Sequence, residues 1–127
     1  MDQALRPRSG HVVLVDDDEA LVASTRFLLE LDGFEVETLA SAEDLLTHRL
    51  PERDACLVLD QHFEGLSGLD ALARLRAQGM KLPTLLITTH APERMRRRAA
   101  ELDAVVVLKP LLGDALAVEI SRALHPV

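Results

Sequence analysis

Acidic side chains follow two of the short apolar runs in this sequence, and a hydroxyl and an amine follow two others. One run leads into Asp16 and Asp17, a second into Asp60, and later runs end at Thr88 and Lys109. Nearly continuous apolar runs rich in β-branched residues are typical of strands buried on both faces of a parallel sheet. Because open α/β sheets bind ligands at the carboxyl ends of their strands, we expect these five side chains to converge.

This set of side chains suits phosphoryl transfer to an aspartate. Three carboxylates a few ångströms apart raise one another's pKa, so a cation must balance their charge. An oxygen-only ligand set with open positions favours Mg²⁺, with Mn²⁺ as the alternative metal. The Lys109 ammonium would neutralise phosphoryl oxygens, the Thr88 hydroxyl would hydrogen-bond one of them, and a carboxylate would be the nucleophile.

Simpler interpretations exist for each residue alone. The acids are also typical of helix caps and solvated loops, Thr88 alone is typical of an ordinary strand end, and Lys109 could be a structural ion-pair partner of Asp60. The occurrence of all of them at strand ends favours the functional interpretation.

Five apolar runs alternate with five helical patterns, which predicts an α/β fold with a doubly wound, five-stranded parallel sheet. Strand order 2-1-3-4-5 places the first and third strands side by side. Leu21, Leu28 and Leu31 are predicted to form one apolar stripe of the first helix, and Asp17 or Asp18 to cap it. The predicted strands cover residues 11–15, 34–39, 55–59, 82–88 and 104–108, and the last helix runs from about 112 to 124.

Composition limits the class of protein. The 127 residues fit one domain, here residues 11–125, after a flexible leader at 1–10 and with no output domain in this chain. A net charge of −7 and only three aromatic residues argue against direct binding to nucleic acid or anionic membrane. The single cysteine, Cys56, fits a reducing compartment. With neither a membrane span nor a secretion signal in the sequence, we expect a cytoplasmic location.

Several stretches of this sequence resemble the receiver domain of two-component response regulators, the CheY-like family. The matching stretches are Val13 to Asp18, Leu57 to Asp60, Gly65 to Leu69, Pro83 to Thr88, and Leu108 to Pro110. Gly33 to Val36 and Ser41 to Glu43 look closest to the nitrogen-fixation-regulator branch. The resemblance covers nearly the whole domain and implies the flavodoxin-like fold.

The resemblance also implies roles for individual residues. Asp60 would accept a phosphoryl group from the phosphohistidine of a sensor histidine kinase. Asp17 and Asp60 would bind Mg²⁺ directly, Asp16 through water, and the backbone carbonyl of His62 would be a further ligand. Thr88 and Lys109 would hold the phosphoryl oxygens. The peptide bond from Lys109 to Pro110 is expected to be cis.

The sequence departs from the family pattern near this site. Phe63-Glu64 replaces the usual Met-Pro, which predicts a less fixed metal-side loop. Val106 stands where the family often has an aromatic residue, and Thr89 where the residue is usually small. His62 and His90 flank the phosphoryl pocket by analogy, and we expect them to tune the phosphoryl lifetime.

If His62 and His90 tune the phosphoryl lifetime, their charge state alters dephosphorylation near neutral pH, and a decay rate that is flat between about pH 6 and 8 would contradict this hypothesis. Two other interpretations are that the histidines are plain exposed loop residues, or that they form a transition-metal site with Asp60.

Two other functions are open at this stage. A degenerate receiver would be a phosphorylation-independent protein-interaction module. A haloacid-dehalogenase-type phosphatase would use Asp16 as its nucleophile, but only Asp114 and Glu119 follow Lys109 as acids. In the main interpretation the chain is a phosphoacceptor switch with self-catalysed phosphorylation and dephosphorylation, and not a turnover enzyme.

The expected partners are a sensor histidine kinase and, through the face of the fourth and fifth helices, a second copy of the chain. The arginine-rich fourth helix, with four arginines between Arg94 and Arg98, is either a solvated face or part of that surface.

Overall fold

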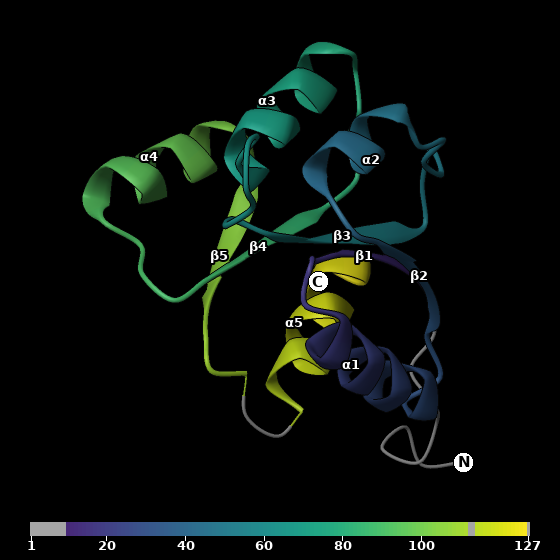
Figure 1. The fold of residues 1–127 in the computed structure, drawn as a ribbon. Helices are drawn as coiled ribbons and strands as arrows, with labels where there is room; N and C mark the ends of the chain where they lie inside the picture. Colours follow the sequence, from purple (N-terminus) through teal and green to yellow (C-terminus); the bar gives the residue numbers. More distant parts are fainter. Residues whose placement is uncertain (1–9, 112–113, 127) are drawn as a thin grey trace.

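The computed structural model describes residues 10–111 and 114–126. Within these residues the chain alternates five strands with five helices (Figure 1). The predicted α/β fold class is therefore confirmed. In chain order the elements are β1 (His11–Val15), α1 (Glu19–Leu31), β2 (Glu35–Leu39), α2 (Ala42–Thr47), β3 (Ala55–Asp60), α3 (Gly68–Ala77), β4 (Thr84–Thr88), α4 (Glu93–Glu101), β5 (Ala104–Leu108) and α5 (Ala115–Leu124).

The strands form one parallel sheet in the predicted order, β2-β1-β3-β4-β5. Helices α1 and α5 cover one face of the sheet, and α2, α3 and α4 cover the other (Figure 1). Val15 of β1 lies opposite Leu59 of β3. The residues that follow them, Asp16 and Asp60, are therefore neighbours at the carboxyl edge of the sheet.

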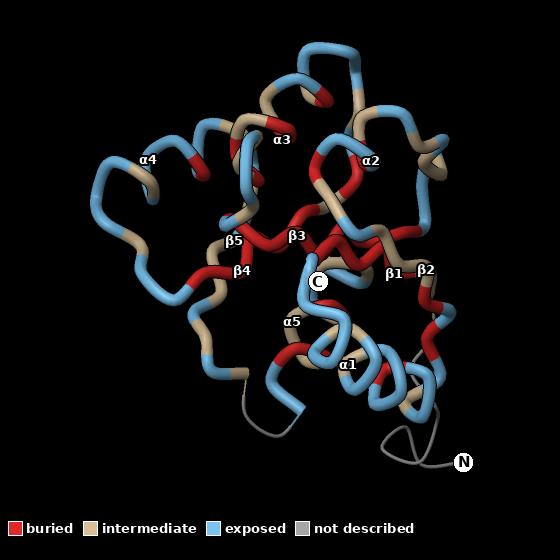
Figure 2. Tube along the Cα trace, in the orientation of Figure 1, coloured by how far each residue is buried: buried red, intermediate tan, exposed pale blue. Residues whose placement is uncertain are grey.

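The central strands hold the core. All six residues of β3 are buried, and the buried segments in Figure 2 run through the middle of the sheet. Because successive side chains of a strand point to opposite faces, the core divides into two apolar clusters, one under each helical layer. The edge strand β5 is more open, since Val105 and Leu108 keep 52% and 46% of their surface exposed. Asp60 thus ends a strand that is buried along its whole length.

Polar side chains cap the first three helices. Asp18 accepts a hydrogen bond from the Leu21 amide before α1, and Ser41 and Ser67 accept equivalent bonds at α2 and α3. These caps satisfy amide groups that have no partner within the helix. Gly33, with φ of +104°, follows the end of α1 as predicted.

Some predicted boundaries are corrected. β4 begins at Thr84 and not at Leu82, because Pro83 has no amide to contribute to the ladder. β2 begins after Phe34, whose amide bonds to the Leu29 carbonyl and belongs to the turn. The predicted start of the last helix near Leu112 lies outside the described residues, as does nearly all of the predicted leader.

The prediction of an apolar stripe on α1 needs a larger correction. Leu21, Leu28 and Leu31 are not buried in the core, and their exposed fractions are 36%, 57% and 69%. The side chain that α1 buries is Leu29, and Val22 packs partly against the same core cluster. Several large side chains of α1 therefore face away from the core, and α1 is mostly exposed in Figure 2.

Within the described ranges, no helix has the length and apolar character needed to cross a membrane.

Candidate phosphoryl-transfer site

The predicted acidic residues come together at the carboxyl edge of the sheet. One carboxylate oxygen from each of Asp16, Asp17 and Asp60 lies within 4.8 Å of the other two. Asp60 and Asp16 are nearly buried, at 5% and 9% exposure, whereas Asp17 is exposed. The cluster therefore has a buried side, formed by Asp16 and Asp60, and an open side at Asp17 that solvent reaches.

Burial raises the pKa of Asp16 above its ordinary value, and the negative charges of Asp60 and Asp17 raise it further. A hydrogen bond from the Asp18 amide to Asp16 Oδ1, at 3.0 Å, and the charge of Lys109 act in the opposite direction. The net rise in pKa means that the ionised form of Asp16 is disfavoured where it lies, mainly because it is buried and further because two carboxylates are near. A cation would favour the ionised form.

The donor set fits a hard divalent cation. All three side chains offer oxygens, the ligand atoms that Mg²⁺ prefers. Asp60 Oδ1 is buried and has no hydrogen bond from the described residues, although the Lys109 ammonium lies 3.4 Å away. A buried carboxylate oxygen without a donor is costly unless an ion satisfies it.

Lys109 is placed by the end of β5. Its amide donates to the Thr88 carbonyl at 2.8 Å, which fixes the backbone beside β4. Its side chain, 24% exposed, reaches across to the buried carboxylate of Asp60. The peptide bond to Pro110 is cis, as expected. Lys109 therefore supplies the one ammonium that pairs with Asp60 among the described residues.

Thr88 ends β4 fully buried, but its hydroxyl has other partners than Asp60. It donates to the His90 carbonyl at 2.9 Å and lies 3.1 Å from His62 Nε2. Because a hydroxyl carries one proton, a Thr88 hydroxyl that donates to the His90 carbonyl can only accept from His62, and this contact then requires the tautomer of His62 that carries hydrogen on Nε2. The two histidines predicted to flank the pocket thus both contact the threonine, His62 through its ring and His90 through its backbone.

Comparison with known proteins assigns the chain to a family. The family model for the response regulator receiver domain matches residues 12–121. The transcriptional regulatory protein FixJ of Bradyrhizobium diazoefficiens is 34% identical over 117 residues, which cover 91% of this chain and 57% of FixJ. The chain belongs to the receiver-domain family of response regulators.

Solved structures agree. The structure of the response regulator StyR is 38% identical, with a TM-score of 0.81, over 91% of this chain and 59% of StyR. The crystal structure of FixJ-N is 29% identical, with a TM-score of 0.77, over 94% of this chain and 98% of FixJ-N. The receiver domain is therefore FixJ-like, as the sequence predicted, and it spans just over half the length of the FixJ relatives, 57% and 56% in two of them.

Membership in this family makes the receiver domain a signalling component of a two-component system and not a classical enzyme. It also overturns the haloacid-dehalogenase alternative, which made Asp16 the nucleophile, because the match extends over nearly the whole chain.

Two residues that fix the loop between Asp60 and α3 were not predicted as site residues. Gln61, nearly buried next to Asp60, accepts a hydrogen bond from the Leu69 amide through Oε1 at 2.8 Å. Gly68 approaches so closely that a Cβ there would lie 2.3 Å from the Asp60 carbonyl oxygen. In the sequence, these roles could have been suspected because Gln61 is a polar residue directly after a buried strand and Gly68 is a glycine at the start of a helix. Their contacts join the loop to α3, although Phe63-Glu64 stands where the family usually has Met-Pro.

The remaining predicted tuning residues are Val106 in β5 and Thr89 directly after β4. Val106 of β5 is half-buried and packs against the core cluster on the α2, α3 and α4 side. Thr89 is exposed, directly after Thr88. Their influence on the phosphoryl group stays a prediction, as does the ligand role of the His62 carbonyl.

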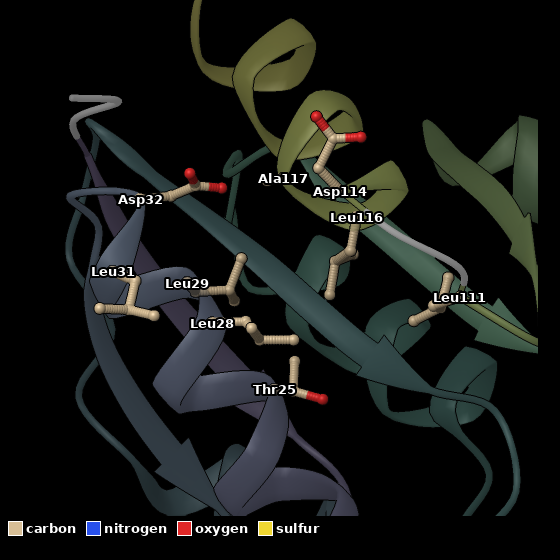
Figure 3. A pocket seen from close by; sticks show the side chains of 9 residues that line it. All are labelled: Thr25, Leu28, Leu29, Leu31, Asp32, Leu111, Asp114, Leu116 and Ala117. Carbon is tan, nitrogen blue, oxygen red and sulfur yellow. The ribbon is translucent and has the colours of Figure 1, made fainter. Parts of the chain in front are cut away.

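A wide groove of the receiver domain lies elsewhere, between α1 and α5, with a volume of about 520 Å³ (Figure 3). Its described lining is mostly apolar, with one hydroxyl and two carboxylates but no cationic side chain to neutralise a phosphoryl group, so we assign the chemistry to the acidic cluster. The lining residues are Thr25, Leu28, Leu29, Leu31, Asp32, Leu111, Asp114, Leu116 and Ala117.

Proposed function

We propose that this receiver domain accepts a phosphoryl group on Asp60 from the phosphohistidine of a sensor histidine kinase, and that Mg²⁺ is required. The observation that carries the proposal is the gathering of the Asp16, Asp17 and Asp60 carboxylates within 4.8 Å, with the Lys109 ammonium 3.4 Å from Asp60 Oδ1.

In the proposed reaction a carboxylate oxygen of Asp60 attacks the phosphorus atom. The new P–O bond forms as the P–N bond to the kinase imidazole breaks, and the electron pair stays on the imidazole nitrogen, which takes up a proton from solvent. The product is an acyl phosphate on Asp60. Return to the starting state needs only water, which hydrolyses that bond and releases inorganic phosphate.

The residues of the chain position and neutralise the transferring group. Asp16, Asp17 and Asp60 would hold Mg²⁺ (or Mn²⁺), with the His62 carbonyl as a further ligand, and the metal would neutralise phosphoryl oxygens. Lys109 already lies beside the acceptor and would keep contact with a phosphoryl oxygen. Charge neutralisation of this kind is the main catalytic contribution in phosphoryl transfer. Phosphorylation and dephosphorylation would therefore be catalysed by this site itself.

Thr88 would have to change partners. Its single hydroxyl proton is now given to the His90 carbonyl, so a hydrogen bond to a phosphoryl oxygen requires that bond to break. This change of hydrogen-bond partner would couple phosphorylation of Asp60 to the loop between β4 and α4, which lies next to the face formed by α4, β5 and α5. We infer that this face changes its interaction with an output domain or a second copy.

The wider context of the proposal comes from the relatives. Several carry the name of transcriptional regulatory proteins and are longer than this chain. A cytoplasmic location and a transcriptional output are parts of the proposal that rest on this kinship alone.

A degenerate receiver, acting without phosphorylation, is the second candidate. Two observations favour it: the Thr88 hydroxyl is engaged by His62 and His90, and Val106 offers no aromatic ring to rotate.

The test is intact mass after incubation with acetyl phosphate and Mg²⁺, with Asp60→Asn as the matched control. We expect a gain of one phosphoryl group that needs Mg²⁺, is lost with hydroxylamine, and is absent from the variant. Because some receivers accept only from their kinase, beryllofluoride binding is measured in parallel. Absence of both in a folded protein would contradict the proposal and favour the degenerate module.

A further inference from the structure

The residue after the proposed phosphoacceptor, Gln61, is a polar side chain in a buried position. It directly follows β3 and keeps only 9% of its surface exposed. A buried polar group must be hydrogen-bonded, because its removal from water otherwise costs free energy. The hydrogen-bond partners of Gln61 therefore indicate what holds this part of the chain in place.

Gln61 accepts hydrogen bonds from two of the first three amides of α3. Its backbone carbonyl accepts from the Gly68 amide at 3.1 Å, and its side-chain Oε1 accepts from the Leu69 amide at 2.8 Å. The third amide, that of Asp70, donates to the Ser67 hydroxyl at 3.1 Å. The first amides of a helix have no partner within the helix, so Gln61 serves the start of α3 with both its backbone and its side chain.

Gln61 is also bonded to the neighbouring strand. Its amide donates to the Ile87 carbonyl of β4 at 3.0 Å. The start of α3 lies directly on the backbone before Gln61, since a Cβ at Gly68 would be 2.3 Å from the Asp60 carbonyl oxygen. The amide, the carbonyl and the side chain of Gln61 are thus all engaged, and together they fix the chain between β4 and α3.

The next residue, His62, carries the backbone carbonyl that we proposed as a further ligand of Mg²⁺. His62 is exposed, whereas Phe63 on its other side is half-buried and packs against the core cluster on the side of α2, α3 and α4. No proline restricts the backbone between Asp60 and Gly68. The direction of the His62 carbonyl therefore depends on the contacts of its neighbours, and those of Gln61 are the hydrogen bonds.

We propose that Gln61 is a positioning residue that sets the affinity of the acidic cluster for Mg²⁺, because it fixes the backbone that carries the His62 carbonyl. Gln61 acts through this backbone and not by contact with the metal. Groups that orient metal ligands typically change metal affinity by about 10- to 100-fold. The inference rests on the proposed function, since it assumes that Asp16, Asp17 and Asp60 hold Mg²⁺.

The first test compares Gln61→Met with Ser67→Ala. Methionine keeps the length and the unbranched shape of glutamine, but it offers the Leu69 amide only a weakly accepting sulfur. Ser67→Ala removes a comparable hydrogen bond from the Asp70 amide in the same turn, without altering the residue next to Asp60. A loss of helix capping alone would therefore affect the two variants alike.

Mg²⁺ affinity is measured by titration of each folded variant, followed through the amide resonances of the three aspartates. We expect the dissociation constant to rise about tenfold or more for Gln61→Met and to stay within about twofold for Ser67→Ala. Equal affinities in the two variants would overturn the role of Gln61 and leave the proposed function intact. Absence of Mg²⁺ binding to the unchanged protein would contradict the proposed function and this inference with it.

A measurement on the unchanged protein avoids any effect of substitution on folding. Coupling between two binding events is reciprocal, so if the bond from the Leu69 amide to Gln61 favours Mg²⁺ binding, Mg²⁺ must stabilise that bond by the same factor. Hydrogen exchange of the Leu69 amide should therefore slow about tenfold in saturating Mg²⁺, and that of the Asp70 amide by clearly less. Equal slowing of both amides, or no change at Leu69, would overturn the proposal.

Discussion

Two polar clusters on the same parallel sheet differ in how they are built. At the carboxyl edge, Asp16, Asp17 and Asp60 lie at the ends of buried strands and present only oxygens. Around Glu37, the middle residue of β2, the imidazoles of His11 and His48 contact one carboxylate. The first set gathers like charges and suits a hard cation and a phosphoryl group, whereas the members of the second set are partners of one another.

The two clusters also differ in how deeply their carboxylates are buried. Asp60 is 5% exposed at the end of a fully buried strand, so its charge must be balanced locally. The Glu37 side chain, 33% exposed on an edge strand, is partly screened by water. We therefore expect substitutions at the carboxyl edge to have larger effects than those around Glu37.

The largest effect is expected for Lys109→Met. This change removes the one ammonium paired with Asp60 and keeps most of the side-chain volume. Phosphorylation by acetyl phosphate should slow by about 10²-fold or more, because the developing charge on the phosphoryl oxygens loses a preorganised cation. The measurement is the initial rate from intact mass. A rate within twofold of the unchanged protein would show that the lysine only pairs with Asp60.

A substitution in the cluster around Glu37 should leave the phosphoacceptor site unaffected. His48→Gln removes the imidazole that contacts the Glu37 carboxylate, and none of these side chains belongs to the acidic cluster. We expect Mg²⁺-dependent phosphorylation to stay within about twofold of the rate of the unchanged protein, because one neutral contact far from the reacting group is lost. The initial rate from intact mass is the measurement, and a much slower rate in a folded variant would contradict the independence of the two clusters.

A smaller effect is expected for His62→Ala, which removes the imidazole bound to the Thr88 hydroxyl at 3.1 Å. One hydrogen bond of about 1 kcal/mol corresponds to about fivefold in rate. Since Thr88 must turn toward the phosphoryl group, we expect phosphorylation to become faster by up to this factor. The comparison variant is His125→Ala. A slower rate for His62→Ala would mean that the ring supports the threonine and does not hold it back.

The smallest effect is expected outside both clusters, at the ion pair that joins α3 to α4. Arg98 Nη2 donates to Asp70 Oδ1 at 2.8 Å, and this bond lowers the pKa of Asp70. A lowered pKa adds stability that is full above the ordinary value of 3.8 and is lost as the pH falls through the lowered pKa. Because both side chains are nearly half exposed, Asp70→Asn should cost only about 0.5 kcal/mol at neutral pH, measured by urea unfolding. This loss of stability should vanish at acidic pH. A loss of the same size at acidic pH would exclude the ion pair as its cause.

The carboxyl-edge site was predictable because each of its main residues directly follows a strand in the sequence. Buried β-branched runs identify the strands, and strand order then places Asp16, Asp17 and Asp60 together. The strand order was an assumption of this argument, and the cis bond before Pro110 was implied by the family resemblance; the structure confirms both.

The cluster at Glu37 was not predictable in this way. It depends on the register that places Glu37 beside β1, and on the position of His48 at the end of a short helix. Neither is visible in spacing along the chain. The outward position of Leu28 and Leu31 was missed for a related reason, since the helical period defines a stripe but not which stripe faces the sheet.

The partners of Thr88 illustrate a third limit. Its position at a strand end predicted that it would reach the site, whereas the orientation of its hydroxyl depends on the loops that carry His62 and His90. Loop conformation responds to local hydrogen bonds that the sequence pattern does not determine.

The central claim, that Asp60 is the phosphoacceptor, is tested most directly by locating the acyl phosphate within the chain. Reduction with borohydride converts an aspartyl phosphate into homoserine, which tandem mass spectrometry of the peptides can place. After incubation with acetyl phosphate and Mg²⁺, we predict homoserine at position 60 and unmodified aspartate at positions 16 and 17. Homoserine at Asp16 or Asp17, or at none of the three in a protein that has gained the phosphoryl mass, would contradict the account.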